Sequence, residues 1–380
     1  VRETLVYADF ADRDVVRISE ALGGGIQTAI VNYACVTPEI NHLVIARVRD
    51  GQATYNWPSN CKLVLINASL KNFLRQGRRA LTYCDESTVI HLHSSYAGVL
   101  RVFPHPARKI IYSPHCFGFD RRDLTVFKRG GVRGVEQLLA NVRSQTICTV
   151  SGDEYDKANA LLFRFRRRGT KVVSVPNSPP TSTVRAGSAQ SLGNIERQLG
   201  SERTQVVTIG RVLAQKDPKL YAEVAELVTK FADVQFCWIG DGDAASVRTL
   251  EASGVEVTGW LSPQKVQERL NQSHLYLHTA SWEGAPFATV EAAAMGIPVI
   301  SRDIPSMRSL GYAMGGTTAE ELALSVGTFI SSRQYSQRVR SVTAEVLRNN
   351  NRGKMKAQVE SLYSRCLLYT SPSPRDATLS

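Results

Sequence analysis

Short apolar runs rich in β-branched residues alternate with longer amphipathic stretches along most of the chain. The runs show no polar alternation, which is typical of strands buried on both faces of a sheet. The stretches between them are long enough for helices, so the pattern predicts βαβ units and a parallel sheet covered on both sides. In the first half, the runs lie at residues 15–19, 42–48, 62–66, 88–93, 109–113, 146–151 and 171–175.

The alternation stops over residues 178–202, which are rich in Ser, Gly and Pro, and this composition predicts a linker at 179–203. It then restarts, so we predict a second doubly wound sheet whose strand ends face those of the first across a ligand-binding cleft. The later runs lie at 205–210, 234–240, 255–260, 274–279 and 297–301, with amphipathic stretches at 217–231, 262–272 and 286–296.

This organisation divides the chain into an N-terminal domain, residues 1–178, and a C-terminal domain, residues 204–352. Residues 1–13 precede the first strand-like run and carry no clear pattern. The tail, residues 367–380, changes composition abruptly and lacks periodicity, so we expect it to be non-native, vector-type sequence outside the fold.

The composition is that of a globular protein and excludes several classes. The chain has 380 residues, 43% hydrophobic and 21% charged, a length that favours two domains. No window approaches the roughly 18 uninterrupted apolar residues that a membrane span needs. Seven cysteines, odd in number and without a CxxC pair, favour a reducing cytoplasm over a disulfide framework or structural zinc site.

The net charge of +12 is concentrated in the first half of the chain. Residues 1–180 hold 25 Lys and Arg against 15 Asp and Glu, whereas residues 181–380 hold 21 against 19. An acidic partner is therefore expected to meet the N-terminal domain. A basic cluster in that domain comprises Arg164, Arg166, Arg167, Arg168 and Lys171.

Two glutamates stand out in the segment SWEGAPFATVEAAAMGIPVIS, residues 281–301. Pro286 fits the first turn of a helix that Gly296 would end, so Glu283 lies in the preceding loop and Glu291 little more than a turn inside. A helix N-terminus can hold a phosphate, and the two carboxylates could accept hydrogen bonds from a ribose and a second sugar. By itself, the spacing equally fits a helix-dipole residue and a solvated loop residue.

Two cations follow another predicted strand. Arg211 and Lys216 lie in a loop that opens a helix at Asp217, a setting suited to a diphosphate, although surface cations are also common there. Further along, Gly240 lies in the turn IGDGD, where the backbone could approach a base or a phosphate. Asp241 and Asp243 of this turn imitate a metal-binding DxD, but turns after strands are commonly rich in Gly and Asp.

Together, these fragments resemble the nucleotide-binding half of the retaining glycosyltransferases of family 4, which have the GT-B fold of two Rossmann-like domains. The resemblance rests on GRVLAQK (210–216), IGDG (239–242) and EGAPFATVEA (283–292), in that order and spacing. It extends from about residue 15 to 366 and weakens at the linker and at 302–316. In the N-terminal domain it is carried by residues 20–34, 90–95, 113–117, 149–154 and 175–180.

The resemblance implies roles for individual residues around a nucleoside diphosphate sugar, a UDP or GDP sugar. It places Arg211 and Lys216 on the diphosphate and Glu291 on the ribose hydroxyls. Glu283, with the backbone of Gly284, Ala285 and Phe287, would face the donor sugar. From the opposite wall, Gly24 and Gly25 would present main-chain N–H groups to the phosphates, and His115 would reach the donor sugar or the acceptor. A last helix, residues 353–366, would cross back to the N-terminal domain.

The resemblance further implies transfer with retention of configuration, to a glycan or lipid-linked acceptor, without an obligatory metal or other cofactor. We therefore expect a cytoplasmic enzyme of polysaccharide biosynthesis, peripheral at the inner face of the membrane through its basic cluster. His91 and His93 alternate on one strand face, but no third ligand indicates a metal site. Asn177 would line the hinge or cap a turn.

Two alternatives are weighed against this interpretation. A nucleotide-sugar epimerase of the same fold would need acidic groups that shuttle a proton at the sugar ring. A basic, non-catalytic nucleic-acid-binding protein would explain residues 161–171 and the sequence pI of about 9.5, but no nucleic-acid motif is present. It would leave Arg211, Lys216, Glu283 and Glu291 unexplained, so we expect no nucleic-acid partner.

Overall fold

The computed structural model describes residues 5–47, 57–67, 69–107, 109–163, 169–180 and 203–367. Most of the expected linker and the expected non-native tail therefore lie outside the described residues. The same holds for the four arginines of the basic cluster, Arg164, Arg166, Arg167 and Arg168.

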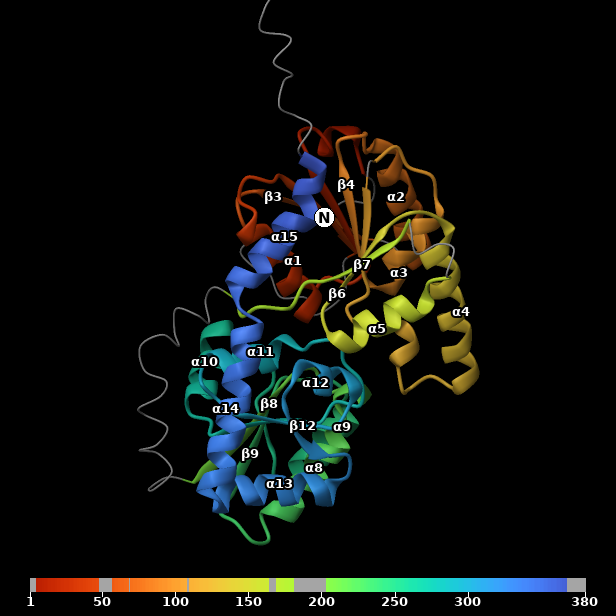
Figure 1. The fold of residues 1–380 in the computed structure, drawn as a ribbon. Coiled ribbons are helices and arrows are strands. Elements are labelled where there is room, and N and C mark those ends of the chain that lie inside the picture. The colour runs from red at the N-terminus through yellow and green to blue at the C-terminus, as the bar shows by residue number, and fades with distance from the viewer. Residues whose placement is uncertain are drawn as a thin grey trace, which may run out of the picture.

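The N-terminal domain is built on a seven-stranded sheet in the order β3-β2-β1-β4-β5-β6-β7, and its neighbouring strands pair in parallel (Figure 1). The central strands are buried along their length, as the apolar runs predict. The strands are β1 (Val15–Ser19), β2 (His42–Arg47), β3 (Cys61–Ile66), β4 (Val89–His93), β5 (Lys109–Ser113), β6 (Thr146–Thr149) and β7 (Lys171–Ser174).

The C-terminal domain repeats this plan with a six-stranded parallel sheet in the order β10-β9-β8-β11-β12-β13. Both sheets therefore reverse direction beside their first strand, which is the arrangement of a doubly wound fold. The predicted fold class, two Rossmann-like α/β domains, is confirmed. The strands are β8 (Thr204–Ile209), β9 (Val234–Ile239), β10 (Glu256–Val257), β11 (Leu275–His278), β12 (Val299–Arg302) and β13 (Ala313–Gly316).

One strand, β13, has no counterpart among the predicted runs, because its sequence AMGG is short and half glycine. Gly315 is required by packing: a Cβ there would lie 2.7 Å from Ile300 and 2.9 Å from Leu322. Where a helix packs closely on a strand, the strand needs small residues there and so has little hydrophobic pattern. Conversely, β10 is shorter than its predicted run and spans only Glu256–Val257.

Helices cover both faces of each sheet (Figure 1). Several begin at side-chain caps, such as Ser69, Thr125 and Ser151, whose hydroxyls accept a backbone N–H of the first turn. In the N-terminal domain they are η1 (Tyr7–Asp9), α1 (Gly24–Val36), α2 (Leu70–Tyr83), α3 (Ser94–Gly98), η2 (Val99–Val102), η3 (Gly118–Asp120), α4 (Val126–Val142) and α5 (Gly152–Leu161). In the C-terminal domain they are η4 (Ala214–Lys216), α8 (Pro218–Val228), α9 (Ala244–Ala252), α10 (Pro263–Asn271), α11 (Phe287–Ala294), α12 (Pro305–Leu310), α13 (Ala319–Ser331) and α14 (Arg333–Asn349).

The last helix, α15 (Arg352–Leu367), lies against the N-terminal domain although it follows α14 of the other domain (Figure 1). Its buried face enters the core around β1, β4 and β5. Burying one large apolar side chain stabilises a fold by about 1.5–3 kcal/mol. Because the helix buries several of them, it joins the two domains firmly. The residues of that face are Met355, Val359, Leu362 and Tyr363.

The segment before β1 also belongs to the N-terminal core. Leu5 and Phe10 are buried in the main cluster of that domain, and the ring of Tyr7 packs edge-on against Tyr83 of α2. This packing was not predicted, because two apolar side chains on either side of a short 3₁₀ turn form no periodic pattern. Within the described residues, no helix combines the length and apolar character needed to cross a bilayer.

Gly240 and Gly210 bring the ends of β9 and β8 into direct backbone contact. Gly240 has a φ of +140°, and a Cβ on it would lie 2.1 Å from the carbonyl oxygen of Gly210. The same oxygen accepts a hydrogen bond from the indole of Trp238, at 2.9 Å, so it has little freedom to move. The glycine is therefore required by the fold itself.

We expect Gly240→Ala to lower the free energy of unfolding of the C-terminal domain by more than about 3 kcal/mol. Backbone strain of about 1–3 kcal/mol would add to the clash with Gly210. Gly254→Ala is the matched control, because Gly254 also has a positive φ, +74°, but a Cβ there meets no atom within 4 Å. That variant should lose only about 1–2 kcal/mol. Urea unfolding that gives equal losses for the two variants would contradict the packing role.

Candidate active site

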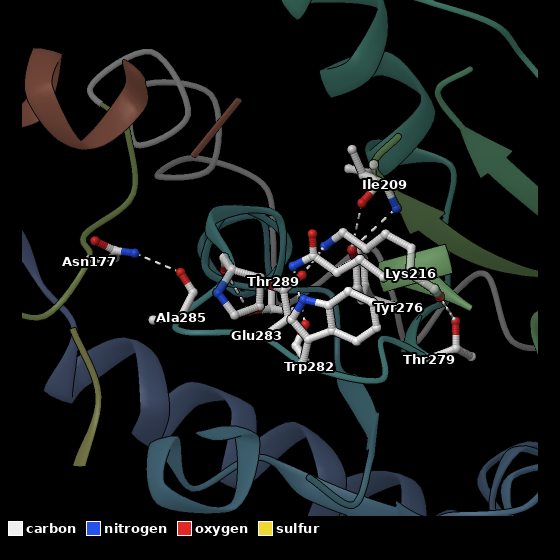
Figure 2. Close-up of polar contacts among 12 residues, drawn as sticks. Asn177, Ile209, Lys216, Tyr276, Thr279, Trp282, Glu283, Ala285 and Thr289 are labelled. Carbon is white, nitrogen blue, oxygen red and sulfur yellow. Dashed lines mark hydrogen bonds and ion pairs between the residues drawn. The ribbon is translucent and has the colours of Figure 1, made fainter. Parts of the chain in front are cut away.

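The candidate site lies at the carboxyl ends of the strands, where the order of the C-terminal sheet reverses between β8 and β11. Loops that follow these two strands diverge toward opposite faces of the sheet and leave a crevice, the usual ligand position in doubly wound folds. The loop after β8 carries Arg211 and Lys216, and the loop after β11 carries Glu283. Figure 2 shows how the two loops meet.

Lys216 and Glu283 form the ion pair that joins these loops. The Nζ atom of Lys216 lies 2.6 Å from Oε1 of Glu283, and the side chains are 18% and 11% exposed (Figure 2). Burial alone would lower the pKa of Lys216, but the Glu283 carboxylate outweighs it and holds the pKa above its usual range. Lys216 therefore carries a full positive charge at neutral pH. Thr279 fixes the backbone by donating to the Lys216 carbonyl at 2.8 Å.

A second ion pair beside the first was not predicted from the sequence. Arg302, at the end of β12, donates to Oδ2 of Asp217 at 2.7 Å and to the hydroxyl of Ser281 at 3.0 Å. Asp217 has a φ of +52° and also caps α8 by accepting from the N–H of Leu220. The signal in the sequence was only a lone Arg after a strand, in the stretch where the family resemblance weakens.

Arg211 is exposed on the same loop as Lys216, and its charge opposes, without reversing, the upward shift of the pKa of that lysine. The charges of Arg211 and Lys216 therefore add in the same region beside the loop. A cavity of about 560 Å³ opens next to the loop and is shared by both domains. It is lined by Arg122 and Asp123 of the N-terminal domain and by Asp217, Ser281 and Trp282, among others, of the C-terminal domain.

Glu291 lies in the second turn of α11 and is partly exposed. Burial raises the pKa of this carboxyl to about 7, and it makes no hydrogen bond with any residue that the structure describes. Pro286 is the N-cap of α11 rather than a residue of its first turn, and it offers no side chain to the free N–H groups. The start of this helix can therefore accept an anion or a polar ligand.

The opposite wall of the cleft is formed by the N-terminal domain. A Cβ on Gly284 would lie 3.0 Å from the backbone nitrogen of Cys116, so the turn at His115–Cys116 packs directly on this glycine. Asn177 donates to the carbonyl of Ala285 at 2.6 Å (Figure 2), which is a bridge between the domains at the predicted hinge. A Cβ on Gly25 would lie 3.4 Å from the ring of Phe287.

Of the two predicted glycines in α1, Gly24 has a φ of +52° and a Cβ there would meet no atom, whereas Gly25 faces Phe287. Both are exposed at the first turn of the helix. Gly240 packs on Gly210, and its predicted role near a ligand stays a prediction. The carboxylates of its turn make local bonds, Asp241 with the N–H of Gly242 and Asp243 as the N-cap of α9.

The turn that carries His115 is strained and firmly held. His115 and Cys116 have φ values of +51° and +87°, a region that costs an L-residue about 1–3 kcal/mol. Glu154 of α5 holds the turn by accepting from the N–H of Cys116 at 2.7 Å and of Val150 at 2.8 Å. Burial and the charge of Arg17 lower the pKa of His115 to about 4, so this imidazole is neutral at pH 7.

Comparison with known proteins gives a consistent result. The profile of the family "Glycosyl transferases group 1" matches residues 203–331. An uncharacterized 41.2 kDa protein of the cps region of Klebsiella pneumoniae is 26% identical over 77% of this chain and 82% of its own length. The Escherichia coli UDP-Gal:alpha-D-GlcNAc-diphosphoundecaprenol alpha-1,3-galactosyltransferase is 23% identical over 65% of each chain.

Among solved structures, HepE from Anabaena in complex with UDP-glucose superposes with a TM-score of 0.69 at 15% identity, over 92% of this chain and 99% of its own. This likeness concerns the fold alone. Residues 203–331 are therefore a glycosyl transferases group 1 domain, set in a chain with the two-domain GT-B fold of glycosyltransferases.

Proposed function

We propose that this glycosyltransferase moves a sugar from a nucleoside diphosphate sugar to a glycan or lipid-linked acceptor, with retention of anomeric configuration. The observation that carries the proposal is the position of Lys216, Arg211 and Glu291 on elements that border one crevice at the β8–β11 reversal. Two cations and a free carboxylate match a diphosphate joined to a ribose. A UDP sugar is favoured over a GDP sugar, because UDP appears in the names of the E. coli relative and the HepE complex.

In the proposed complex, Arg211 and Lys216 bind the diphosphate and Glu291 accepts from the ribose hydroxyls. The second carboxylate oxygen of Glu283, together with the backbone from Gly284 to Phe287, faces the donor sugar. Because Glu283 already bonds Lys216 at 2.6 Å, it also aims the lysine. The exposed N–H groups at the start of α1, at Gly24 and Gly25, approach the phosphates from the other wall.

The proposed chemistry follows from where charge develops. As the bond between the anomeric carbon and the diphosphate oxygen breaks, negative charge grows on that oxygen, and Lys216 and Arg211 stabilise it. The acceptor hydroxyl adds to the same face of the anomeric carbon, and its proton passes to the departing phosphate oxygen. Front-face transfer of this kind retains configuration and requires no carboxylate nucleophile.

An epimerase of the same fold would use the same donor site, so the two activities are separated by omitting the acceptor. Incubation with UDP-sugar alone should leave the sugar unchanged. An epimerised sugar under these conditions would overturn the transferase proposal. The cps-region relative and the E. coli galactosyltransferase both favour a role in polysaccharide synthesis.

We expect Lys216→Ala to lower kcat by about 10²–10³, because the lysine faces charge that grows in the transition state. Glu291→Gln should chiefly raise KM for the donor, since a ribose contact is the same before and during the reaction. Glu283→Gln should orient the donor sugar less well, but free UDP should inhibit this variant as strongly as it inhibits the wild type. Lys230→Ala, an exposed lysine beyond the far end of α8, is the matched control. Steady-state kinetics with Lys216→Ala and Glu291→Gln both within twofold of wild type would refute the site.

We expect the affinity for UDP-glucose to rise with pH through about 7, the pKa to which burial raises Glu291. Hydroxyl donors favour the ionised carboxylate, so binding is complete above the pKa and weakens as the proton returns below it. Calorimetry should show about tenfold weaker binding at pH 6 than at pH 8, following the ionised fraction. Glu291→Gln should show no such slope. UDP-glucose is the probe because each of its phosphates is linked on both sides and has no proton that titrates in this range.

We also propose that the N-terminal domain meets an anionic membrane surface, where a lipid-linked acceptor would lie. The described structure supports this through α4, which leaves one face apolar and uncovered. Phe127, Leu138 and Val135 on that face are 92%, 64% and 50% exposed. Their spacing places them on one side of the helix, and the exposed cations Lys128 and Arg122 flank its first turn.

We expect the protein to sediment with anionic vesicles at low salt and to be released as salt rises, because each cation near the surface adds about 1 kcal/mol. The double substitution Phe127→Ser with Leu138→Ser should weaken this binding several-fold. Leu324→Ser, at an apolar position of α13 that is 71% exposed, is the control in the other domain. Equal sedimentation with neutral and anionic vesicles would refute the membrane surface.

A further inference from the structure

The N-terminal domain contains a fully buried arginine, Arg17, at the centre of β1. Within the described residues, no carboxylate pairs with it. Its hydrogen-bonding neighbours are instead three histidines and a tyrosine. Arg17 contacts His42 Nδ1, His91 Nδ1 and His93 Nε2, each at 3.3 Å, and the hydroxyl of Tyr363 at 2.8 Å. The rings of Tyr33 and Tyr363 also face the guanidinium at 5.3 and 5.5 Å.

The chemistry of these contacts fixes the protons of the histidines. A guanidinium has only donors and keeps its charge, so each nitrogen that it contacts must present a lone pair. A neutral imidazole carries one proton, which must then lie on the other nitrogen. For His93 this other nitrogen is Nδ1, which is 2.9 Å from Nε2 of His115. His93 therefore donates to His115.

The remaining contacts agree with this assignment. His91 accepts at Nδ1 from Arg17 and from the Tyr363 hydroxyl at 2.8 Å, and it donates from Nε2 to Ser113 at 2.8 Å. His42 accepts at Nδ1 and donates from Nε2 to Thr37 at 3.1 Å. The Thr37 hydroxyl then donates to a backbone carbonyl at 2.8 Å. These imidazole contacts fit one arrangement of protons, in which the lone pair of His91 Nδ1 is shared by Arg17 and the Tyr363 hydroxyl.

The last member of the network, His115, lies in the strained turn that packs on Gly284 at the candidate site. Because its Nε2 accepts from His93, its proton lies on Nδ1. The ring is partly exposed, and Nδ1 makes no hydrogen bond with any described residue. Protonation of Nε2 would require His93 to turn a proton toward the charge of Arg17, which opposes it.

We propose that Arg17 is a positioning residue that acts through His93 to hold His115 as the neutral Nδ1–H tautomer, a hydrogen-bond donor toward an oxygen of the sugar substrate. The inference rests on the proposed function for the identity of that oxygen, but not for the tautomer. Other titratable groups around the turn are Asp120 of η3, Glu154 of α5 and Glu283 of the facing loop, all near Cys116. His91 and Lys157 complete the set.

Nitrogen NMR of protein labelled in the histidine rings tests the tautomer without any assay of activity. In the wild type, the His115 signals, assigned by their loss in His115→Gln, should show the Nδ1–H form without titration from pH 5.5 to 8. In Arg17→Met, the His93 and His115 rings should exchange tautomers or His115 should begin to titrate in this range. Met has a similar length, and the partners of Arg17 are neutral, so the substitution leaves no unpaired buried charge and we expect this variant to fold.

Tyr363→Phe is the matched control, because it removes one contact of Arg17 but none of His93. It should leave the His115 signals unchanged. Should Arg17→Met fail to fold, the wild-type spectrum alone still tests the tautomer of His115. An Nε2–H tautomer or an imidazolium at His115 above pH 6 would overturn the proposal.

Kinetics then test the link to the reaction. Arg17→Met and His115→Gln should lower kcat by factors within about threefold of each other, and the double variant should lose no more than either one. Multiplicative losses would show that Arg17 acts independently of His115 and would overturn its positioning role. The NMR spectra could show the expected His115 tautomer while neither the wild type nor any variant transfers sugar. That result would count against the proposed function and leave the tautomer assignment standing.

Discussion

The ion pair between Lys216 and Glu283 fixes the geometry on which the rest of the candidate site depends. It spans the two loops that leave the C-terminal sheet on either side of its reversal, and both side chains are largely buried. A buried cation without a partner would lose its proton or its position. With Glu283 beside it, Lys216 keeps its charge and still borders the space that Arg211 and the start of α11 share.

The same loop as Glu283 also sets how the two domains meet. Gly284 lies against the turn at Cys116, and Ala285 accepts from Asn177 near the hinge. Any side chain at position 284 would separate these walls by several tenths of an ångström. The carboxylate that holds the lysine and the glycine that admits the N-terminal domain are neighbours in sequence. Charge placement and domain contact are therefore determined by one short loop.

The N-terminal domain stabilises the charges of two fully buried arginines in two different ways. Arg101 is neutralised by Glu136 at 2.6 Å, which ties α4 to the strands beneath it through Tyr112. Arg17 is solvated by imidazole lone pairs and a hydroxyl. An ion pair cancels the charge locally, whereas neutral acceptors leave its field in place. That field acts on every histidine near it, and it lowers the pKa of His115 at the cleft.

The amino-acid sequence was enough to predict the two doubly wound domains, because strands buried on both faces leave a continuous apolar pattern. It also determined that Arg211, Lys216 and Glu283 lie after parallel strands, since such strands end at one edge of the sheet. Their pairing was not in the pattern. Sequence spacing says nothing of which loop a side chain crosses to, so the Lys216–Glu283 and Arg302–Asp217 bonds appeared only in the tertiary structure.

Other elements and groups depend on residues that fit a particular space in the packed fold, and these could not be predicted. β13 is a strand because Gly315 fits beneath a neighbouring helix, and Gly240 is a glycine because Gly210 lies 2.1 Å from where its Cβ would be. In the sequence, Arg17 is one cation in an apolar run, His93 alternates with His91, and His115 follows another strand. Their contacts join residues from different strands, and hydrogen bonds over such separations leave no periodic trace in the sequence.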